Sequence, residues 1–184
     1  MNLVPLKINT GIRQFESEVM TRNPKNIAIH EAGHAVMRFI EGFDISEVSI
    51  ISDGKHDGHV EGKNPLYGID PREDIDQKYR SQAFACARTW IAGRAAEQSF
   101  NIDDEESVEL ARDDLVKAYN LLSFYTNINE ISEVATNMFK DVRSILCKPN
   151  YNEAIEQLSK ALLKNKRLSG EDATSIIEQA VNPY

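Results

Sequence analysis

The clearest periodic pattern of hydrophobic and polar positions lies between residues 25 and 42. Four apolar side chains recur there at steps of three and four, which predicts the packed face of an amphipathic helix. They are Ile29, Ala32, Val36 and Phe39. Asn23 can cap the start of this helix, Pro24 suits its first turn, and Gly42 can end it.

Helical spacing of apolar residues recurs through the rest of the chain. It predicts further helices over 74–100, 107–125, 128–146, 152–164 and 169–181. After the first helix, residues 44–51 alternate as a strand does, and the glycine-rich stretch 52–68 predicts turns with a short partner strand near 59–61. We therefore predict a mainly α fold of the α+β type, with a small hairpin or sheet beside the helix at 25–42.

Length and composition fit one globular domain. The chain has 184 residues, 41% of them hydrophobic and 27% charged, which is enough to bury a core. We predict a leader over residues 1–24 and a single domain over 25–184. The leader has three apolar residues that predict one or two amphipathic turns, Ile12, Phe15 and Val19. No run of about eighteen apolar residues and no signal-peptide pattern occurs, so we expect a cytoplasmic protein with no membrane segment.

Charge and cysteine content narrow the possible partners and sites. The formal net charge is -8, from 29 acidic and 21 basic side chains, which argues against nucleic-acid binding. Cys86 and Cys147 are the only cysteines, and both fall among apolar neighbours in helical segments. We expect two buried free thiols rather than a disulfide or a metal site.

The helix at 25–42 also carries a chemical motif, His30-Glu31-x-x-His34. Histidines four residues apart lie about one helical turn apart on the same side, so both rings can reach one tetrahedral metal ion. The glutamate between them can lie over the metal-bound water, as in zinc peptidases. These side chains point away from the apolar stripe, which predicts a helix with one packing face and one chemical face.

A catalytic zinc site needs a third protein ligand, and Asp114 is the best candidate. It lies about 70° from the centre of the buried stripe of the helix at 107–125, and a carboxylate that faces the core must be paired, protonated or bound to metal. That stripe comprises Val108, Ala111, Leu115, Ala118 and Leu122. Glu97 is the alternative ligand, although Arg94 three residues before it favours an ion pair instead. Histidines of a glycine-rich loop are more often simply solvated, and two lie there, His56 and His59.

Five segments resemble the peptidase domain of the FtsH-type ATP-dependent zinc proteases, in the order found in that family. They are His-Glu-Ala-Gly-His-Ala at 30–35, Glu-Val-Ser-Ile-Ile at 47–51, Ala-Gly-Arg-Ala-Ala-Glu at 92–97, Asp-Asp-Leu-x-x-Ala at 113–118 and the stretch ending in Leu-Ser-Gly at 161–170. The resemblance implies a mostly helical, zincin-like domain. Its zinc ligands would be His30, His34 and Asp114, and Glu31 would be the catalytic base.

The chain departs from this family at residues 52–54, where the family tends to have Pro-Arg-Gly, and at 106–110, which replace a Thr-Thr-Gly loop. No phosphate loop occurs ahead of the motif. We therefore expect a soluble, ATP-independent zinc endopeptidase that cleaves unfolded or flexible polypeptide segments, with a separate ATPase as a candidate partner. We expect the substrate to add as a strand along the edge at 48–51. The alternative is a catalytically inactive binding or regulatory module that acts through a partner ATPase or protease.

Overall fold

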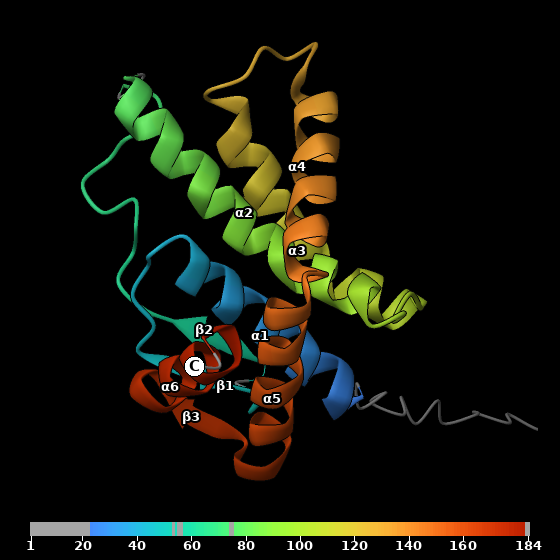
Figure 1. Ribbon diagram of the computed structural model, residues 1–184. Coiled ribbons are helices and arrows are strands. Elements are labelled where there is room, and N and C mark those ends of the chain that lie inside the picture. The colour runs from blue at the N-terminus through green and yellow to red at the C-terminus, as the bar shows by residue number, and fades with distance from the viewer. Residues whose placement is uncertain (1–22, 53, 55–56, 74–75, 183–184) are drawn as a thin grey trace, which may run out of the picture.

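The computed structural model describes residues 23–182, apart from 53, 55–56 and 74–75. This part of the chain forms six helices and a three-stranded antiparallel sheet (Figure 1), which confirms the mainly helical fold with a small sheet. The helices are α1 (Pro24–Ile40), α2 (Gln77–Ser99), α3 (Glu105–Ser123), α4 (Ile131–Leu146), α5 (Pro149–Asn165) and α6 (Gly170–Val181). The strands are β1 (Glu47–Ser49), β2 (His59–Glu61) and β3 (Arg167–Ser169). The leader turns at Ile12, Phe15 and Val19, and also His56, lie outside the described residues.

α1 begins and ends as its flanking residues predict. The Asn23 side chain accepts a hydrogen bond from a backbone N–H of the first turn (3.0 Å), and Pro24 occupies that turn. At the other end Gly42 adopts a positive φ of 71°. The backbone N–H of Phe43 then bonds the carbonyl of Arg38 (2.8 Å), as in a Schellman motif.

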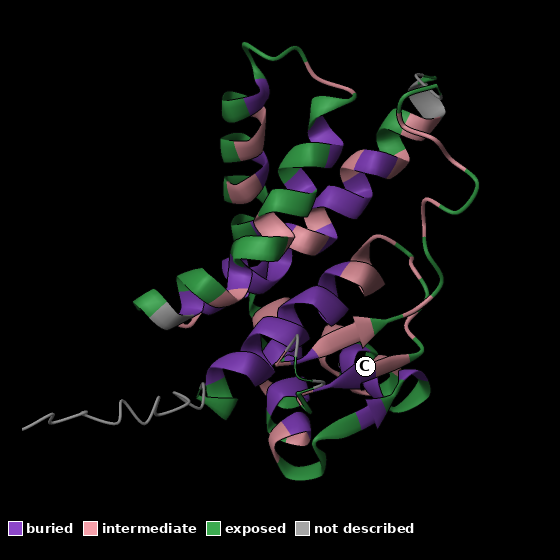
Figure 2. Cartoon of the chain, turned by 180° about the vertical axis from the view of Figure 1, so that it is seen from behind, coloured by how far each residue is buried: buried purple, intermediate pink, exposed green. Residues whose placement is uncertain are grey.

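α1 is buried around most of its circumference, so the prediction of one packing face is incomplete. Every residue from 26 to 37 is buried, the whole His-Glu-x-x-His motif included (Figure 2). Phe39, which the pattern assigns to the packed face, is only half-buried. The chemical face is covered because α2 packs along α1 and α3 brings Asp114 against it. The periodicity of one helix cannot show what covers its polar side.

The sheet has the strand order β2-β1-β3, with both pairs antiparallel. β1 and β2 form the predicted hairpin. β3 is not predicted, because three residues are too few to carry a pattern and its partner strand is remote in sequence. Val48 of β1 pairs with Val60 on one side and Leu168 on the other. The expectation of a free edge at 48–51 is therefore wrong, and the edge strands are β2 and β3.

α1 lies in the middle of the molecule, with α2 on one side and α5 and the sheet on the other (Figure 1). Among the described residues the larger core cluster runs along both sides of α1, and a smaller one forms around Ala83, Cys86 and Leu121. The largest fully buried side chains of the larger cluster include Ile29, Met37, Leu122, Leu158 and Ile177. Within the described residues no helix has the length and apolar character needed to cross a membrane.

Two positions predicted to be buried are exposed. Val108 is 52% exposed, because the end of α2 and the start of α3 project beyond the other elements (Figure 1). Cys147 caps the C-terminal end of α4 and is exposed, because the helical stripe stops at the turn into α5. Cys86 is buried and free, as predicted.

Candidate metal centre

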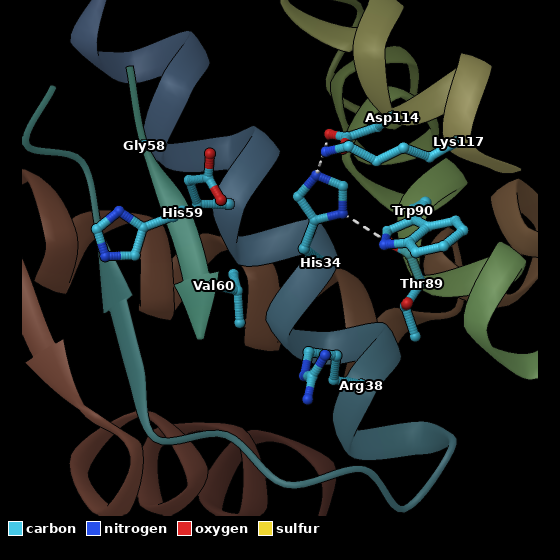
Figure 3. A pocket seen from close by; sticks show the side chains of 10 residues that line it. His34, Arg38, Gly58, His59, Val60, Thr89, Trp90, Asp114 and Lys117 are labelled. Carbon is cyan, nitrogen blue, oxygen red and sulfur yellow. Dashed lines mark hydrogen bonds and ion pairs between the residues drawn. The ribbon is translucent and has the colours of Figure 1, made fainter. Parts of the chain in front are cut away.

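Side chains from α1 and α3 meet at one point inside the molecule. Nε2 of His34 lies 3.1 Å from Oδ2 of Asp114, and Nε2 of His30 lies 3.4 Å from the same oxygen. Figure 3 shows the His34 ring facing Asp114. One candidate ligand atom from each of the three residues lies within 4.8 Å of the other two. The fold thus brings together the three side chains that the sequence nominates as metal ligands.

The spacing of these atoms fits a tetrahedral ion. Zinc bonds of about 2.0–2.1 Å at tetrahedral angles place neighbouring ligand atoms roughly 3.3–3.4 Å apart. The two nitrogen-to-oxygen distances here are 3.1 and 3.4 Å. Two imidazole nitrogens and one carboxylate oxygen also form a donor set that catalytic zinc sites use, with the fourth position left for water or substrate. The residues present therefore fit a zinc ion.

Each histidine ring is oriented by a hydrogen bond at its other nitrogen. Nδ1 of His34 donates to the carbonyl oxygen of Thr89 (2.7 Å), and Nδ1 of His30 lies 3.1 Å from Oε1 of Glu97. A neutral ring that donates through Nδ1 keeps the lone pair on Nε2 available for a metal. Both acceptors belong to α2, so α2 selects the ring orientations in which both Nε2 atoms face Asp114.

Glu97 lies behind His30 and is outside the cluster of ligand atoms. It is fully buried, and its Oε2 accepts a hydrogen bond from Nη1 of Arg94 (3.1 Å), which confirms the predicted ion pair. Arg94 also contacts Asp103 and donates to Oγ of Ser107 (2.7 Å). The two oxygens of Glu97 are thus occupied by Arg94 and His30, which satisfies this buried charge.

The clustered side chains hold opposite charges when no metal ion is bound. Burial favours the neutral form of His30, but hydrogen bonds with Asp114 and Glu97 outweigh burial and raise its pKa to about 10. Burial likewise favours the neutral form of Asp114, whereas hydrogen bonds from His30 and His34 hold its pKa well below the usual range. Metal binding at this position must therefore compete with protonation of His30.

Glu31 of α1 lies beside the cluster and next to Gly58, the residue that precedes β2. A Cβ atom on Gly58 would come within 2.7 Å of Oε1 of Glu31, so the glycine makes room for the carboxylate. Burial raises the pKa of Glu31 above its ordinary value, and His34 and His30 oppose that rise. Glu31 lines a cavity of about 250 Å³ that also borders His34, Asp114 and Trp90 (Figure 3).

The sequence pattern does not predict three residues of the site. A Cβ atom on Gly93 would lie 2.5 Å from Nε2 of His30 and 2.6 Å from Nε2 of His34, so this glycine admits both rings. Thr89 contributes only its carbonyl group, which every residue type has. Nζ of Lys117 lies 3.0 Å from Oδ1 of Asp114, and its spacing of three residues is the one signal that could have identified it.

His59 borders the cavity from β2 but does not belong to the cluster. Its Nε2 lies 3.1 Å from Oε1 of Glu47 on β1. Figure 3 places the His59 ring across β2 from His34. His59 is thus paired with a carboxylate of the sheet and not with the clustered side chains of His30, His34 and Asp114.

Comparison with known proteins leaves the chain without an assigned family. No protein-family model matches it, and no curated protein matches it. The geometry of the site and the sequence motifs therefore provide the indications of function.

Proposed function

We propose that this protein is a zinc-dependent endopeptidase that hydrolyses peptide bonds in unfolded or flexible polypeptide segments without ATP. One observation carries the proposal: Nε2 of His30 and Nε2 of His34 converge on Oδ2 of Asp114, and a cavity borders Glu31, His34 and Asp114. Each histidine is also held by an acceptor at Nδ1. An accidental meeting of polar side chains would not require that second set of contacts.

The chain would hold zinc through His30, His34 and Asp114. When bound, zinc supplies a Lewis acid that polarises the peptide carbonyl and lowers the pKa of a water molecule to about 7. Lys117 holds the second oxygen of Asp114, which leaves Oδ2 as the oxygen that faces the histidines. Glu97 and Thr89 keep the two rings in place.

Glu31 would act as the general base and then the general acid. Its carboxylate takes the proton of the attacking water and passes it to the leaving amine. Burial raises its pKa above the ordinary value, and a raised pKa suits a group that must both accept and release a proton near neutral pH. Gly58 leaves room for the carboxylate, since a Cβ atom there would lie 2.7 Å from its Oε1.

β2 is the strand on which an extended substrate would lie. Residues 58–60 line the cavity, and β2 is an edge strand of the sheet. A peptide that pairs with an edge strand must itself be extended, which favours flexible segments over folded domains. This replaces the expected edge at 48–51.

We also propose that the chain has a zincin-like fold of the FtsH type. Three of the resembling segments, 30–35, 92–97 and 113–118, supply the residues around the cluster. A fourth ends at Gly170, whose backbone N–H bonds the carbonyl of Ser46 (2.8 Å) where β3 leads into α6. Landmarks that are distant in sequence thus support one site and the sheet beside it.

The test compares wild type with Glu31→Gln on a fluorescently labelled, permanently unfolded polypeptide, with zinc content measured in parallel. We expect Glu31→Gln to keep its zinc and to lose about 10²–10⁴-fold in rate, because only the base is removed. Glu109→Gln, an exposed acid on α3, is the matched control and should cleave like wild type. Wild type that binds zinc and the polypeptide without cleaving it would instead favour the binding module.

A further inference from the structure

Arg38 lies in the wall of the cavity, one helical turn beyond His34 on α1. Its guanidinium extends below Val60 of β2 (Figure 3). Four residues of helix correspond to a rise of about 6 Å. Arg38 therefore adds a basic side chain to the cavity roughly one turn along α1 from the candidate metal centre.

Among the described residues, the Arg38 guanidinium donates hydrogen bonds only to backbone carbonyl groups. Nε and Nη2 donate to the carbonyl oxygen of Asp44 (3.0 and 2.6 Å), and Nη2 also donates to that of Lys63 (3.2 Å). The carboxylate of Asp44 instead accepts from the backbone N–H of Lys63 (3.0 Å). Within the described part of the chain, Arg38 has no ion pair and its Nη1 has no acceptor.

The other basic side chains that line the cavity already contact carboxylates. Nζ of Lys117 lies 3.0 Å from Asp114, and Nε2 of His59 lies 3.1 Å from Glu47. Arg38 is the basic group of this lining without such a contact among the described residues. Burial lowers the pKa of its guanidinium below the usual value, which reflects the loss of water around the charge. A bound carboxylate would give this charge an anionic partner.

The guanidinium is held in place before any ligand arrives. A Cβ atom on Gly62 would lie 2.6 Å from Nη2 of Arg38, so the chain after β2 approaches more closely than other residue types permit. The guanidinium carbon lies 5.9 Å from the centre of the Phe43 ring, within cation–π range. A pre-positioned guanidinium loses little conformational entropy when it binds a planar carboxylate.

We propose that Arg38 selects substrates by binding a carboxylate group of the peptide close to the cleaved bond. An extended peptide advances about 3.3 Å per residue, so a rise of about 6 Å along α1 corresponds to roughly two residues. The carboxylate comes either from an aspartate or glutamate side chain or from the C-terminus of the peptide. This inference rests on the proposed peptidase function and names the substrate preference of the same cavity.

The test measures binding through Trp90, the chain's single tryptophan, which lies in the cavity wall. The zinc-loaded Glu31→Gln protein is titrated with three short peptides while Trp90 fluorescence is followed. One is blocked at both ends and contains glutamate, the second has glutamine in its place, and the third is the glutamine peptide with a free C-terminal carboxylate. We expect the glutamate peptide or the free-carboxylate peptide to bind at least tenfold more tightly than the blocked glutamine peptide.

Arg38→Gln should bind the peptides that carry a carboxylate and the blocked glutamine peptide with about equal affinity. Arg80→Gln should keep the preference, because its guanidinium lies over Phe84 outside this cavity. Arg38→Lys keeps the charge and should retain part of the preference, even if Arg38→Gln unfolds. Equal affinity for all three peptides would overturn the inference, and so would a preference that survives in Arg38→Gln. Binding preference without cleavage by wild type would refute the peptidase alone, whereas cleavage without preference would refute the role of Arg38 alone.

Discussion

The two ring nitrogens of His30 have different partners, and this difference distinguishes a candidate ligand atom from the atom that orients the ring. Nε2 faces Asp114, whereas Nδ1 faces Glu97. An acceptor at Nδ1 fixes the ring and makes Nε2 a better donor to a metal. Glu97 is therefore expected to support the site without touching the ion.

Glu97→Gln tests this supporting role. We expect zinc affinity to fall about 10–100-fold, because His30 loses a charged acceptor. The free energy of unfolding should fall by about 1–3 kcal/mol, because Arg94 loses a buried partner. Competition with a fluorescent chelator and urea denaturation give the two values, and the exposed Glu109→Gln should change neither. Loss of zinc as complete as in Asp114→Ala would make Glu97 a ligand.

The raised pKa of His30 predicts how the stability of the metal-free protein depends on pH. Its folded pKa of about 10 exceeds the ordinary value of 6.5, so the folded state binds the proton more tightly. The stabilisation is fully present below about pH 6.5 and is lost as pH rises through about 10. Urea denaturation of chelator-treated protein should show a loss on the order of a few kcal/mol between these limits. Asp114→Asn should flatten the dependence, and an equally steep loss in that variant would contradict the assignment.

At the residue scale, the sequence identifies the candidate metal ligands but not the groups that orient them. His30, Glu31 and His34 are predictable because helical periodicity fixes their common side. Asp114 is predictable because a core-facing carboxylate needs a partner. Thr89 and Gly93 are not predictable, because their roles depend on how closely α2 approaches α1.

At the scale of elements, the close crossing of α1 and α2 positions the site. A Cβ atom on Gly33 would lie 2.5 Å from Cβ of Ala96 and 2.7 Å from the carbonyl oxygen of Ala92. Small residues on both helices thus let the two backbones approach. This approach brings the Thr89 carbonyl and Gly93 against the histidine rings.

Gly33→Ala tests the close crossing by whether the free energy of unfolding rises or falls. In an isolated helix the change stabilises by roughly 0.5–1 kcal/mol, but here the added methyl group has no room. We expect a net loss of about 1–3 kcal/mol from overpacking and weaker zinc binding. Ser144→Ala, at an exposed site on α4, should change stability by less than about 0.5 kcal/mol in thermal or urea unfolding. A more stable Gly33→Ala protein would refute the close crossing.

The elements that the sequence predicts best are those with long, regular patterns. Apolar periodicity predicts all six helices, with ends that differ from the observed ones by up to about three residues. Ser169 caps α6 by accepting from the N–H of Asp172 (3.1 Å). β3 is missed because three residues carry too little pattern. The central position of β1 is missed as a consequence, because β1 lies inside the sheet only when β3 pairs with it.

At the scale of the whole molecule, the core surrounds α1 and leaves its chemical side open at one cavity. Burial on both sides of α1 shields His30 and His34 from water, while the cavity still borders His34 and Asp114. The two cysteines also differ in exposure, since Cys86 is buried and Cys147 is exposed.

Thiol reactivity reports this division. Burial raises the pKa of the Cys86 thiol to about 11, so at pH 8 it carries little thiolate and is shielded from reagents. We expect one thiol per chain to react quickly with a chromogenic disulfide in the native protein and two in denaturant. Cys147→Ser should remove the fast reaction, and Cys86→Ser should leave it intact. Two fast thiols in the native protein would contradict the packing around α2.

The most direct test of the metal centre is elemental analysis of the purified protein beside His34→Ala and Asp114→Ala. If the convergence of His30, His34 and Asp114 is a zinc site, wild type holds about one zinc per chain and both variants lose it while remaining folded by circular dichroism. Wild type that takes up no zinc, even after incubation with it, would contradict the zinc site and the peptidase proposed from it.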